Sequence, residues 1–361
     1  MKLNKLTLIA LVALGAVACD KNDGINNEDN TPRTVTISLA NAEVGSRALE
    51  PAAKTDDKAQ LNTAYVMFAD ADGKVVNLED DDPNKAAQFI GTITDDSEIM
   101  TPTGVTFHEL PSKVEKVAIL GNVEEMTARG YISIDEALEA SKKTALEIQQ
   151  GVDILVLFGQ TEGALEEITV KDQTHMNYYK ATVNLAPLVA RIEVVGIQCT
   201  DLGTDYSKLA INQIAVANFY TESGEVAKVD NFNEYFTDAA GVTKPDYSFD
   251  VLNPTIDLTD QTEKTFTTQA DVKAAYAYNV YPGLTPQIML SMDATLTAGG
   301  DVHKYIAAEK FNGDATLKAG HIYQVKFVFT EKDVTDFDTK CIMVVASVKP
   351  WTVVPLQTTF N

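Results

Sequence analysis

Short runs of alternating apolar and polar residues cover most of the chain, which is the pattern of β-strands with one buried face. A well-defined run lies within residues 33–47, where Val35, Ile37 and Leu39 alternate with threonine and serine. These three apolar side chains share one face of a strand. Small residues follow, and the segment ends at Arg47. We therefore expect a strand at residues 35–39 followed by exposed backbone.

The next segments predict a domain of antiparallel strands with one or two helices over residues 48–186. Both faces of the run around Tyr65 and Phe68 are apolar, so this strand should be central in its sheet. Further on, Ser133 and Glu136 have the spacing of a helix capping box. An apolar stripe at helical spacing follows that box, made of Ile134, Ala137, Leu138, Ser141, Ala145 and Leu146. Strand patterns then return up to about residue 186.

Residues 187–361 carry strand-like runs separated by glycine and proline, and they lack a comparable helical stripe. Frequent turn signals between short strands favour a β-sandwich. The predicted fold class is therefore mainly β: two tandem antiparallel sandwiches, of which the first is α+β.

The start of the chain has the form of a bacterial lipoprotein signal over residues 1–18. Lys2 and Lys5 precede an apolar region, and small residues precede Cys19. The apolar region is too short to span a bilayer, so we expect cleavage before Cys19 and lipidation of that cysteine. Residues 19–47 would then form a polar tether and the first strand. The formal net charge of −23 argues against nucleic acid or an anionic membrane as a ligand.

Candidate chemistry is sparse, and we expect no catalytic residue, cofactor or metal. The four histidines lack metal-ligand spacing and suggest no triad: His108, His175, His303 and His321. The acidic runs at 78–83 and 334–339 fit solvated loops better than calcium sites. Cys199 and Cys341 could form a disulfide, but their apolar surroundings favour two buried free thiols.

The single Trp351 is interpreted as a packing residue. The tyrosines at 276, 278 and 281 are interpreted as core or rim residues, with adhesive contacts as the alternative.

The order of these features resembles the fimbrillin family of Bacteroidales, the subunits of type V pili. The resemblance rests on the cysteine-terminated signal, the strand ending in arginine, LVARIEVVGI at the domain junction, LKAGHIYQVKFVFT, and a terminal VKPWTVVPLQTTFN. It implies two transthyretin-like domains. It also implies lipidation at Cys19, cleavage by an Arg-specific protease between Arg47 and Ala48, and departure of the strand holding Val35, Ile37 and Leu39.

The same resemblance implies that the tail after Trp351 enters the vacated groove of another subunit. Its apolar residues would be Val353, Val354 and Leu356, although Pro355 removes one backbone donor. Arg33 and Lys54 are rival cleavage sites, but cutting at Arg33 would free nothing. The alternative is that residues 35–39 form an ordinary first strand and Arg47 is an ordinary loop residue.

The expected function is that of a structural pilus subunit, most simply a stalk subunit, which supports adhesion and biofilm formation at the outer membrane and cell surface. Its expected partners are other fimbrial subunits and the Arg-specific protease. A tip subunit would keep the groove but lack a usable tail, and an anchor subunit would lack the cut. A surface glycan-binding lipoprotein is the alternative from another class, and a single tryptophan weakens it.

Overall fold

The computed structural model describes residues 31–39, 58–78, 87–94, 97–101, 103–123, 132–142, 146–149, 155–169, 177–222, 225–227, 246–266, 276–283, 286–311, 317–334, 341–350 and 352–355. These ranges all fall within one compact unit, Thr31–Asn361. Cys19, Arg47, Ala48, Trp351 and Leu356 lie outside the described residues.

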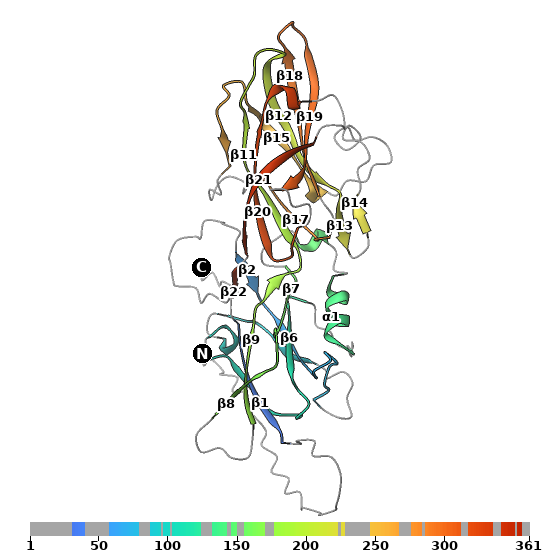
Figure 1. Ribbon diagram of the computed structural model, residues 1–361, viewed down its shortest axis with the longest axis vertical. Coiled ribbons are helices and arrows are strands. Elements are labelled where there is room, and N and C mark those ends of the chain that lie inside the picture. Colours follow the sequence, from blue (N-terminus) through green and yellow to red (C-terminus); the bar gives the residue numbers. More distant parts are fainter. Residues whose placement is uncertain are drawn as a thin grey trace, which may run out of the picture. The chain divides into compact units, whose positions relative to one another are not determined.

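Two sheets are built from the first half of the chain (Figure 1). One has four strands in the order β5-β1-β9-β8, and the other has five in the order β10-β7-β6-β3-β4. Phe107 of the first sheet meets Phe68 of the second edge-on, with ring centroids 5.2 Å apart, so the sheets pack face to face. Their strands are β1 (Arg33–Leu39), β3 (Ala64–Ala69), β4 (Ala87–Ile90), β5 (Val105–Leu110), β6 (Lys116–Gly121), β7 (Leu157–Gln160), β8 (Glu166–Ile168), β9 (Asn177–Val183) and β10 (Ala186–Pro187).

All six residues of β3 are buried, which confirms the prediction of a central strand. Val66 and Phe68 belong to the main core, whereas Tyr65 and Met67 pack on the opposite face against helix α1 (Ile134–Ser141). The predicted cap at Ser133 is present, because its Oγ accepts a hydrogen bond from the Glu136 N–H at 3.1 Å. The Glu136 carboxylate accepts from the N–H of Ile132 at 2.8 Å instead of closing the box on Ser133.

The second half forms a nine-stranded sheet in the order β15-β12-β18-β19-β21-β20-β11-β16, with β17 also paired to β11. Residues 341–344 of β21 pair with β19 and residues 345–350 pair with β20, so this strand passes between the two layers. The strands are β11 (Ala190–Cys199), β12 (Tyr206–Ala217), β15 (Phe249–Asp257), β16 (Lys264–Thr265), β17 (Tyr276–Val280), β18 (Gln287–Leu296), β19 (Asp301–Phe311), β20 (His321–Phe329) and β21 (Cys341–Pro350).

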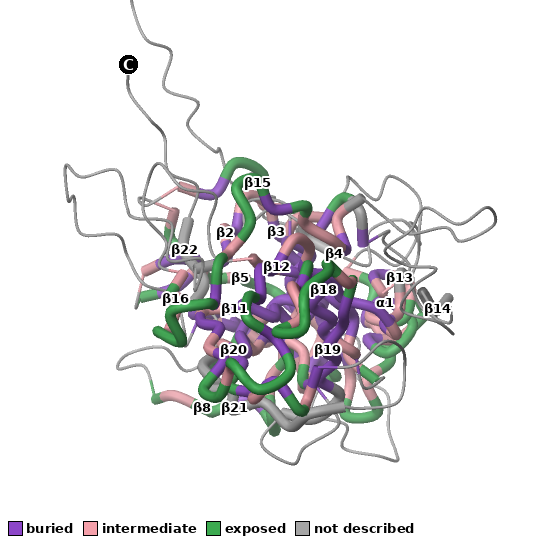
Figure 2. Tube along the Cα trace, turned by 90° about the horizontal axis from the view of Figure 1, so that it is seen from above, coloured by how far each residue is buried: buried purple, intermediate pink, exposed green. Residues whose placement is uncertain are grey.

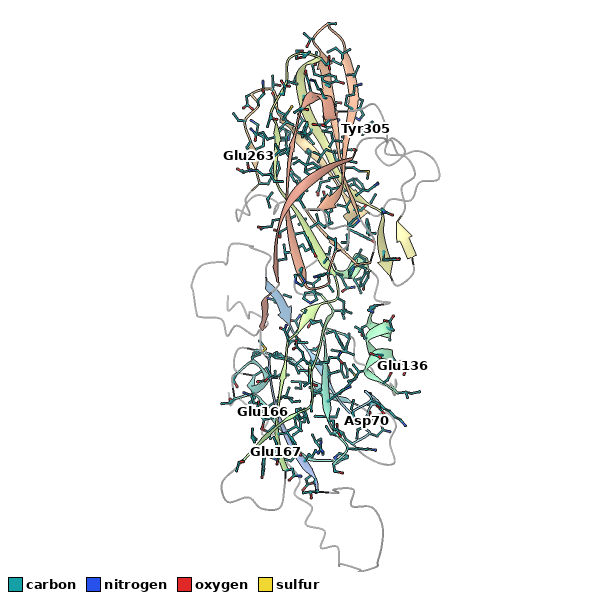
Figure 3. The ribbon with its side chains drawn as sticks, in the orientation of Figure 1. Asp70, Glu136, Glu166, Glu167, Glu263 and Tyr305 are labelled. Carbon is teal, nitrogen blue, oxygen red and sulfur yellow. The ribbon has the colours of Figure 1, made fainter. Side chains whose placement is uncertain are left out.

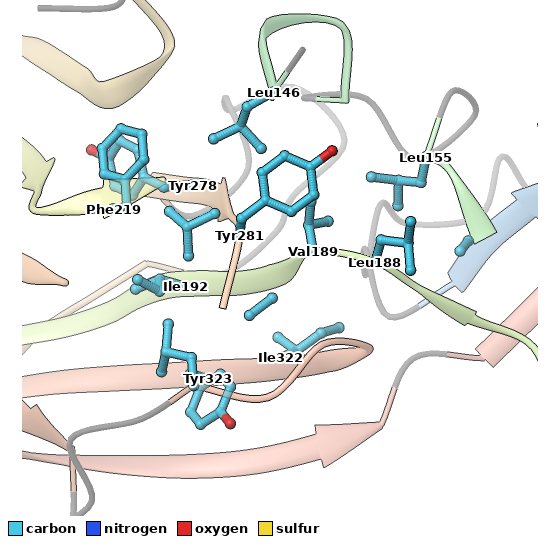
Figure 4. Close-up of a cluster of buried hydrophobic side chains, with 14 of the residues drawn as sticks. Leu146, Leu155, Leu188, Val189, Ile192, Phe219, Tyr278, Tyr281, Ile322 and Tyr323 are labelled. Carbon is cyan, nitrogen blue, oxygen red and sulfur yellow. The ribbon is translucent and has the colours of Figure 1, made fainter. Parts of the chain in front are cut away.

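A buried tyrosine joins the two layers of this second sandwich. The hydroxyl of Tyr278 on β17 donates to the Ile214 carbonyl at 3.3 Å and to the Asp250 carboxylate at 3.0 Å, both in the opposite layer. Tyr278 and Tyr281 are buried, as the core interpretation predicted, and Figure 4 shows Tyr281 beside Leu146 and Val189. In the view of Figure 2, buried residues run along the inner strands while exposed residues occupy turns and edges.

The remaining described elements are short. β2 (Lys58–Leu61) pairs in parallel with β22 (Thr352–Pro355), and β13 (Phe219–Glu222) pairs with β14 (Glu225–Ala227). The 3₁₀ turns are η1 (Glu98–Met100), η2 (Leu146–Gln149), η3 (Asp246–Ser248) and η4 (Glu331–Asp333). None of the described helices has the length and apolar character needed to cross a membrane.

The predicted mainly β fold class is therefore correct, with one α-helix among the described residues. Most strand pairs are antiparallel, as expected. The exceptions are the parallel pairs β1–β9, β2–β22, β11–β20 and β19–β21. The boundary near residue 186 between two folding domains stays a prediction.

Two buried polar groups stabilise the second sandwich. Cys199 is a free, buried thiol whose Sγ donates to the Asp201 carbonyl at 3.4 Å, and burial raises the pKa of this thiol. The carboxylate of Glu331, only 1% exposed, accepts hydrogen bonds of 3.1 to 3.3 Å from four successive backbone N–H groups: those of Gly203, Thr204, Asp205 and Tyr206. It thereby fastens the loop between β11 and β12 to η4. The side chain of Cys341 lies outside the described residues.

Candidate functional site: the position of β1

The predicted first strand, β1, occupies an interior position in its sheet. It pairs antiparallel with β5 on one side and parallel with β9 on the other. Both of its backbone edges are therefore hydrogen-bonded, and Figure 1 shows β1 near the lower end of the view. Removing β1 would leave the facing edges of β5 and β9 without partners.

The side chains of β1 fill the space between the two sheets of the first half. Val35 and Ile37 are completely buried and Leu39 is 9% exposed, so the predicted apolar face is the core-facing one. Buried apolar side chains of this size stabilise by about 1.5–3 kcal/mol each, or roughly 5–9 kcal/mol for three. The vacated position would be an apolar groove with unpaired backbone on both walls.

Gly104, the residue before β5, lets its chain approach β1 very closely. A Cβ atom at Gly104 would lie 2.2 Å from the carbonyl oxygen of Ile37 and 2.7 Å from the carbonyl carbon. Its φ of +71° is also a conformation that favours glycine. The backbone of β1 thus fits against a site that accepts no side chain.

Arg33, the first residue of β1, is attached to three neighbouring elements. Its Nη1 donates to the carbonyl of Val114, in the turn between β5 and β6. Its guanidinium lies 4.8 Å from the ring centroid of Tyr179 on β9, at cation–π distance. Because its backbone is paired with both β5 and β9, Arg33 offers no extended free segment to a protease.

The start of the carboxy-terminal tail has a partner within the same chain. β22 pairs in parallel with β2, with Val353 opposite Ala59 and Val354 opposite Gln60. Ala59 and Leu61 of β2 are completely buried. The side chains of Val353 and Val354 lie outside the described residues, so their role as donor residues stays a prediction.

A Ser–His–Asp arrangement that the sequence did not suggest lies on β18 and β19. His303 Nε2 is 2.8 Å from Ser291 Oγ, and His303 Nδ1 is 3.0 Å from Asp293 Oδ1. Strand pairing places Asp293 opposite His303, so the hairpin register is the signal that would have revealed it. Ser291 is completely buried within a strand, where no substrate carbonyl can reach its oxygen. The arrangement therefore acts as a cross-strand polar network.

An apolar pocket of about 610 Å³ lies beside the end of α1. Leu138, Phe158, Leu188 and Tyr281 contribute to its lining. Glu139 and Lys142 also line it, but they form an ion pair with each other at 2.6 Å, so their charges compensate. The pocket thus has no polar feature that indicates a particular ligand. Among the described residues, no group of acidic, histidine or cysteine side chains is arranged to hold a metal ion.

Comparison with known proteins finds solved structures with a similar fold. No protein-family model matches the chain, and no curated protein matches its sequence. A candidate cell adhesion protein from Bacteroides eggerthii superposes with a TM-score of 0.52 at 12% identity, covering 92% of this chain and all of that one. This likeness shows that the two chains share a fold.

The solved structures that resemble this chain also include a fimbrilin from Porphyromonas gingivalis. It has a TM-score of 0.49 and 14% identity, and the match covers 90% of this chain and 99% of the fimbrilin. A second candidate cell adhesion protein, from Parabacteroides distasonis, has a TM-score of 0.47 and 13% identity, covering 91% of this chain and 99% of its own.

Proposed function

We propose that the protein is a structural subunit of a cell-surface fimbrium that polymerises by strand exchange. In this scheme the precursor is exported as a lipoprotein through Cys19, and an Arg-specific protease cuts the Arg47–Ala48 bond. The tail after Trp351 of another copy then replaces β1 in its sheet. The proposed product is a stalk, an adhesive filament of repeating subunits that supports biofilm formation.

The observation that carries this proposal is the interior position of β1, the first strand among the described residues. An interior vacancy offers unpaired donors and acceptors on two strands beside an apolar groove. A strand from another chain satisfies both by β-augmentation. Because the donor and the groove are different surfaces, such contacts are heterologous, and they build an open filament when the rotation between neighbouring copies does not close a ring.

The free edges of the same sheet are unsuited to strand addition. The edge strand β8 presents the exposed carboxylates of Glu166 and Glu167 (Figure 3), and charges on an edge discourage pairing with a further chain. The opposite edge strand, β5, exposes Thr106, His108 and Glu109. Within the described part of this sheet, the place of β1 therefore offers a strand from another copy a better apolar complement than either edge does.

Treatment with an arginine-specific protease tests the proposal on protein that starts at Asp20. We expect cleavage after Arg47, followed by multimers that resist SDS. The Arg47→Lys variant is the matched control, since it keeps the charge but removes the cleavage site, and it should stay monomeric. Cleavage at Arg47 that yields only monomers, with β1 displaced, would contradict the stalk assignment.

Removal of the tail separates the stalk from the alternatives. A chain that ends at Trp351 should accept a donor strand after cleavage but should add no further subunit, so it terminates filaments. If the full chain already behaves in this way, the protein is a tip subunit. If the protein is never cut and binds to a column of immobilised glycans, it is instead a glycan-binding lipoprotein.

A further inference from the structure

We infer that cleavage after Arg47 does not by itself release β1: the cut strand stays in place, retained by Arg33, until an incoming strand displaces it from the Leu39 end. This inference rests on the proposed function, because it describes how the proposed exchange begins. It assigns to Arg33 the role of a retaining residue, and it gives the exchange a direction along the groove.

The Arg33 end of β1 contacts both neighbouring strands and the turn between β5 and β6, although the ladder with β5 shifts register between Arg33 and Val35. Arg33 pairs with Leu110 of β5 and with Asn177 of β9. The Asn177 N–H also donates to the carbonyl of Pro32 at 3.4 Å, one residue before the strand. The guanidinium adds its contacts with Val114 and Tyr179. A charge-assisted hydrogen bond and a cation–π contact thus act together at this end.

Among the described residues, the Leu39 end has fewer ladder partners. In the ladder with β5 the last pair is Ile37 with Val105, whereas the ladder with β9 continues through Ser38 and Leu39. The final two residues are therefore paired on one side only within the described ladders. Leu39 is also 9% exposed, while Val35 and Ile37 are not exposed at all. Fraying should start here, at the end that the proposed cut sets free.

This asymmetry determines how a replacement strand enters. A strand that runs in the direction of β1 preserves the antiparallel ladder with β5 and the parallel ladder with β9. Its carboxyl end would occupy the place of Leu39 first, and pairing would advance toward the place of Arg33. A chain terminus can enter in this way without threading, which suits a donor segment at the end of its own chain. The contacts of Arg33 would be the last to break.

A direct test follows the cut fragment under conditions that do not depend on the natural cleavage. Residues 44–47 are replaced by the recognition site of a site-specific protease, and the amino-terminal fragment carries a fluorescent label. After cutting, we expect the fragment to co-elute with the body on size exclusion and to leave slowly. Arg33→Ala should speed its departure about tenfold or more, as expected for loss of a hydrogen bond from a charged donor.

Matched variants separate retention by Arg33 from general weakening of the strand. Thr36→Val removes the 2.9 Å hydrogen bond between Thr36 and Thr106 at mid-strand while keeping the side-chain shape, and it should change the rate by about threefold or less. Arg33→Lys keeps the charge but loses the planar fork, so it should be intermediate. Melting of each uncut variant verifies that it folds. Equal rates for Arg33→Ala and the unsubstituted protein would overturn the inference.

The direction is tested with synthetic peptides of residues 31–41 that displace the labelled fragment. Displacement should accelerate with peptide concentration, because exchange requires the incoming strand. A peptide carrying Leu39→Asp should displace much more slowly, whereas Arg33→Ala in the peptide should hardly change the initial rate. A release rate independent of peptide would overturn the inference and leave polymerisation possible. Failure of cleavage at Arg47 in the natural chain would instead overturn the proposed function and leave these rates unaffected.

Discussion

Substitution of Gly104 by alanine tests whether β1 is seated as closely as the structure indicates. Two effects act together in this variant. A φ of +71° costs an alanine about 1–2 kcal/mol. The added Cβ would also lie 2.2 Å from the carbonyl oxygen of Ile37, so β1 or the start of β5 must shift, which typically costs about 1–3 kcal/mol. The expected total loss of stability is about 2–5 kcal/mol.

Gly73 provides the matched control for the conformational part of this cost. Its φ is +82° and nothing lies within 4 Å of its would-be Cβ, so Gly73→Ala introduces strain without a clash. Denaturant unfolding of the uncut proteins should show a loss of about 1–2 kcal/mol for Gly73→Ala and a larger loss for Gly104→Ala. After cutting between β1 and β2, only Gly104→Ala should also speed departure of the β1 fragment. Equal losses of stability and equal departure rates would refute the close seating of β1.

Other parts of the structure lead to further measurements. Ile37→Ala should lower the unfolding free energy of the uncut protein by about 2–5 kcal/mol, because its side chain is fully buried, and a loss below about 1 kcal/mol in urea titrations would contradict that burial. Burial alone would raise the pKa of Glu331, but backbone hydrogen bonds from Gly203, Asp205 and Tyr206 outweigh it and lower this pKa below its ordinary 4.5. The stabilisation that Glu331 supplies is therefore present above pH 4.5 and is lost as the pH falls through the lowered pKa. Glu331→Gln should make the melting temperature depend less on pH in the acid range. An unchanged pH dependence would contradict the contacts of Glu331. In protein that starts at Asp20 and carries Cys341→Ala, Cys199 should react with a thiol reagent only after unfolding, because burial raises the pKa of its thiol and blocks access to it. Rapid labelling of the native protein would contradict the burial of Cys199.

The parts of the fold that were predicted correctly from the sequence depend on local patterns of apolar, polar and capping residues. Alternation identified the strand containing Val35 and Ile37 and the face that it buries, and the double apolar pattern around Phe68 identified a central strand. Short-range chemistry also placed the helix start at Ser133. Each of these features depends on residues only a few positions apart, which is why the sequence reveals them.

Long-range pairing was outside the reach of such patterns. Alternation does not distinguish an edge strand from an interior one with one covered face, so the place of β1 between β5 and β9 could not be read from residues 33–39. The parallel pairing of β22 with β2 joins positions near opposite ends of the chain, and nothing local indicates it. The Ser291–His303–Asp293 network was missed for a related reason, since it depends on the register of a hairpin.

The interior place of β1 has a consequence for any mechanism that removes it. A replaceable edge strand would present one ladder and one neighbouring strand to its successor, whereas the place of β1 presents two ladders and the apolar faces of both sheets. The first arrangement is easier to empty, and the second binds its new occupant more durably, since each ladder hydrogen bond adds about 0.5–1.5 kcal/mol and each buried side chain adds more. For a filament under mechanical load, slow release of the occupant matters more than easy emptying. The need for proteolysis follows from the same point: while β1 remains covalently joined to the rest of its sheet through the segment before β2, its effective concentration at the groove exceeds that of any competing strand.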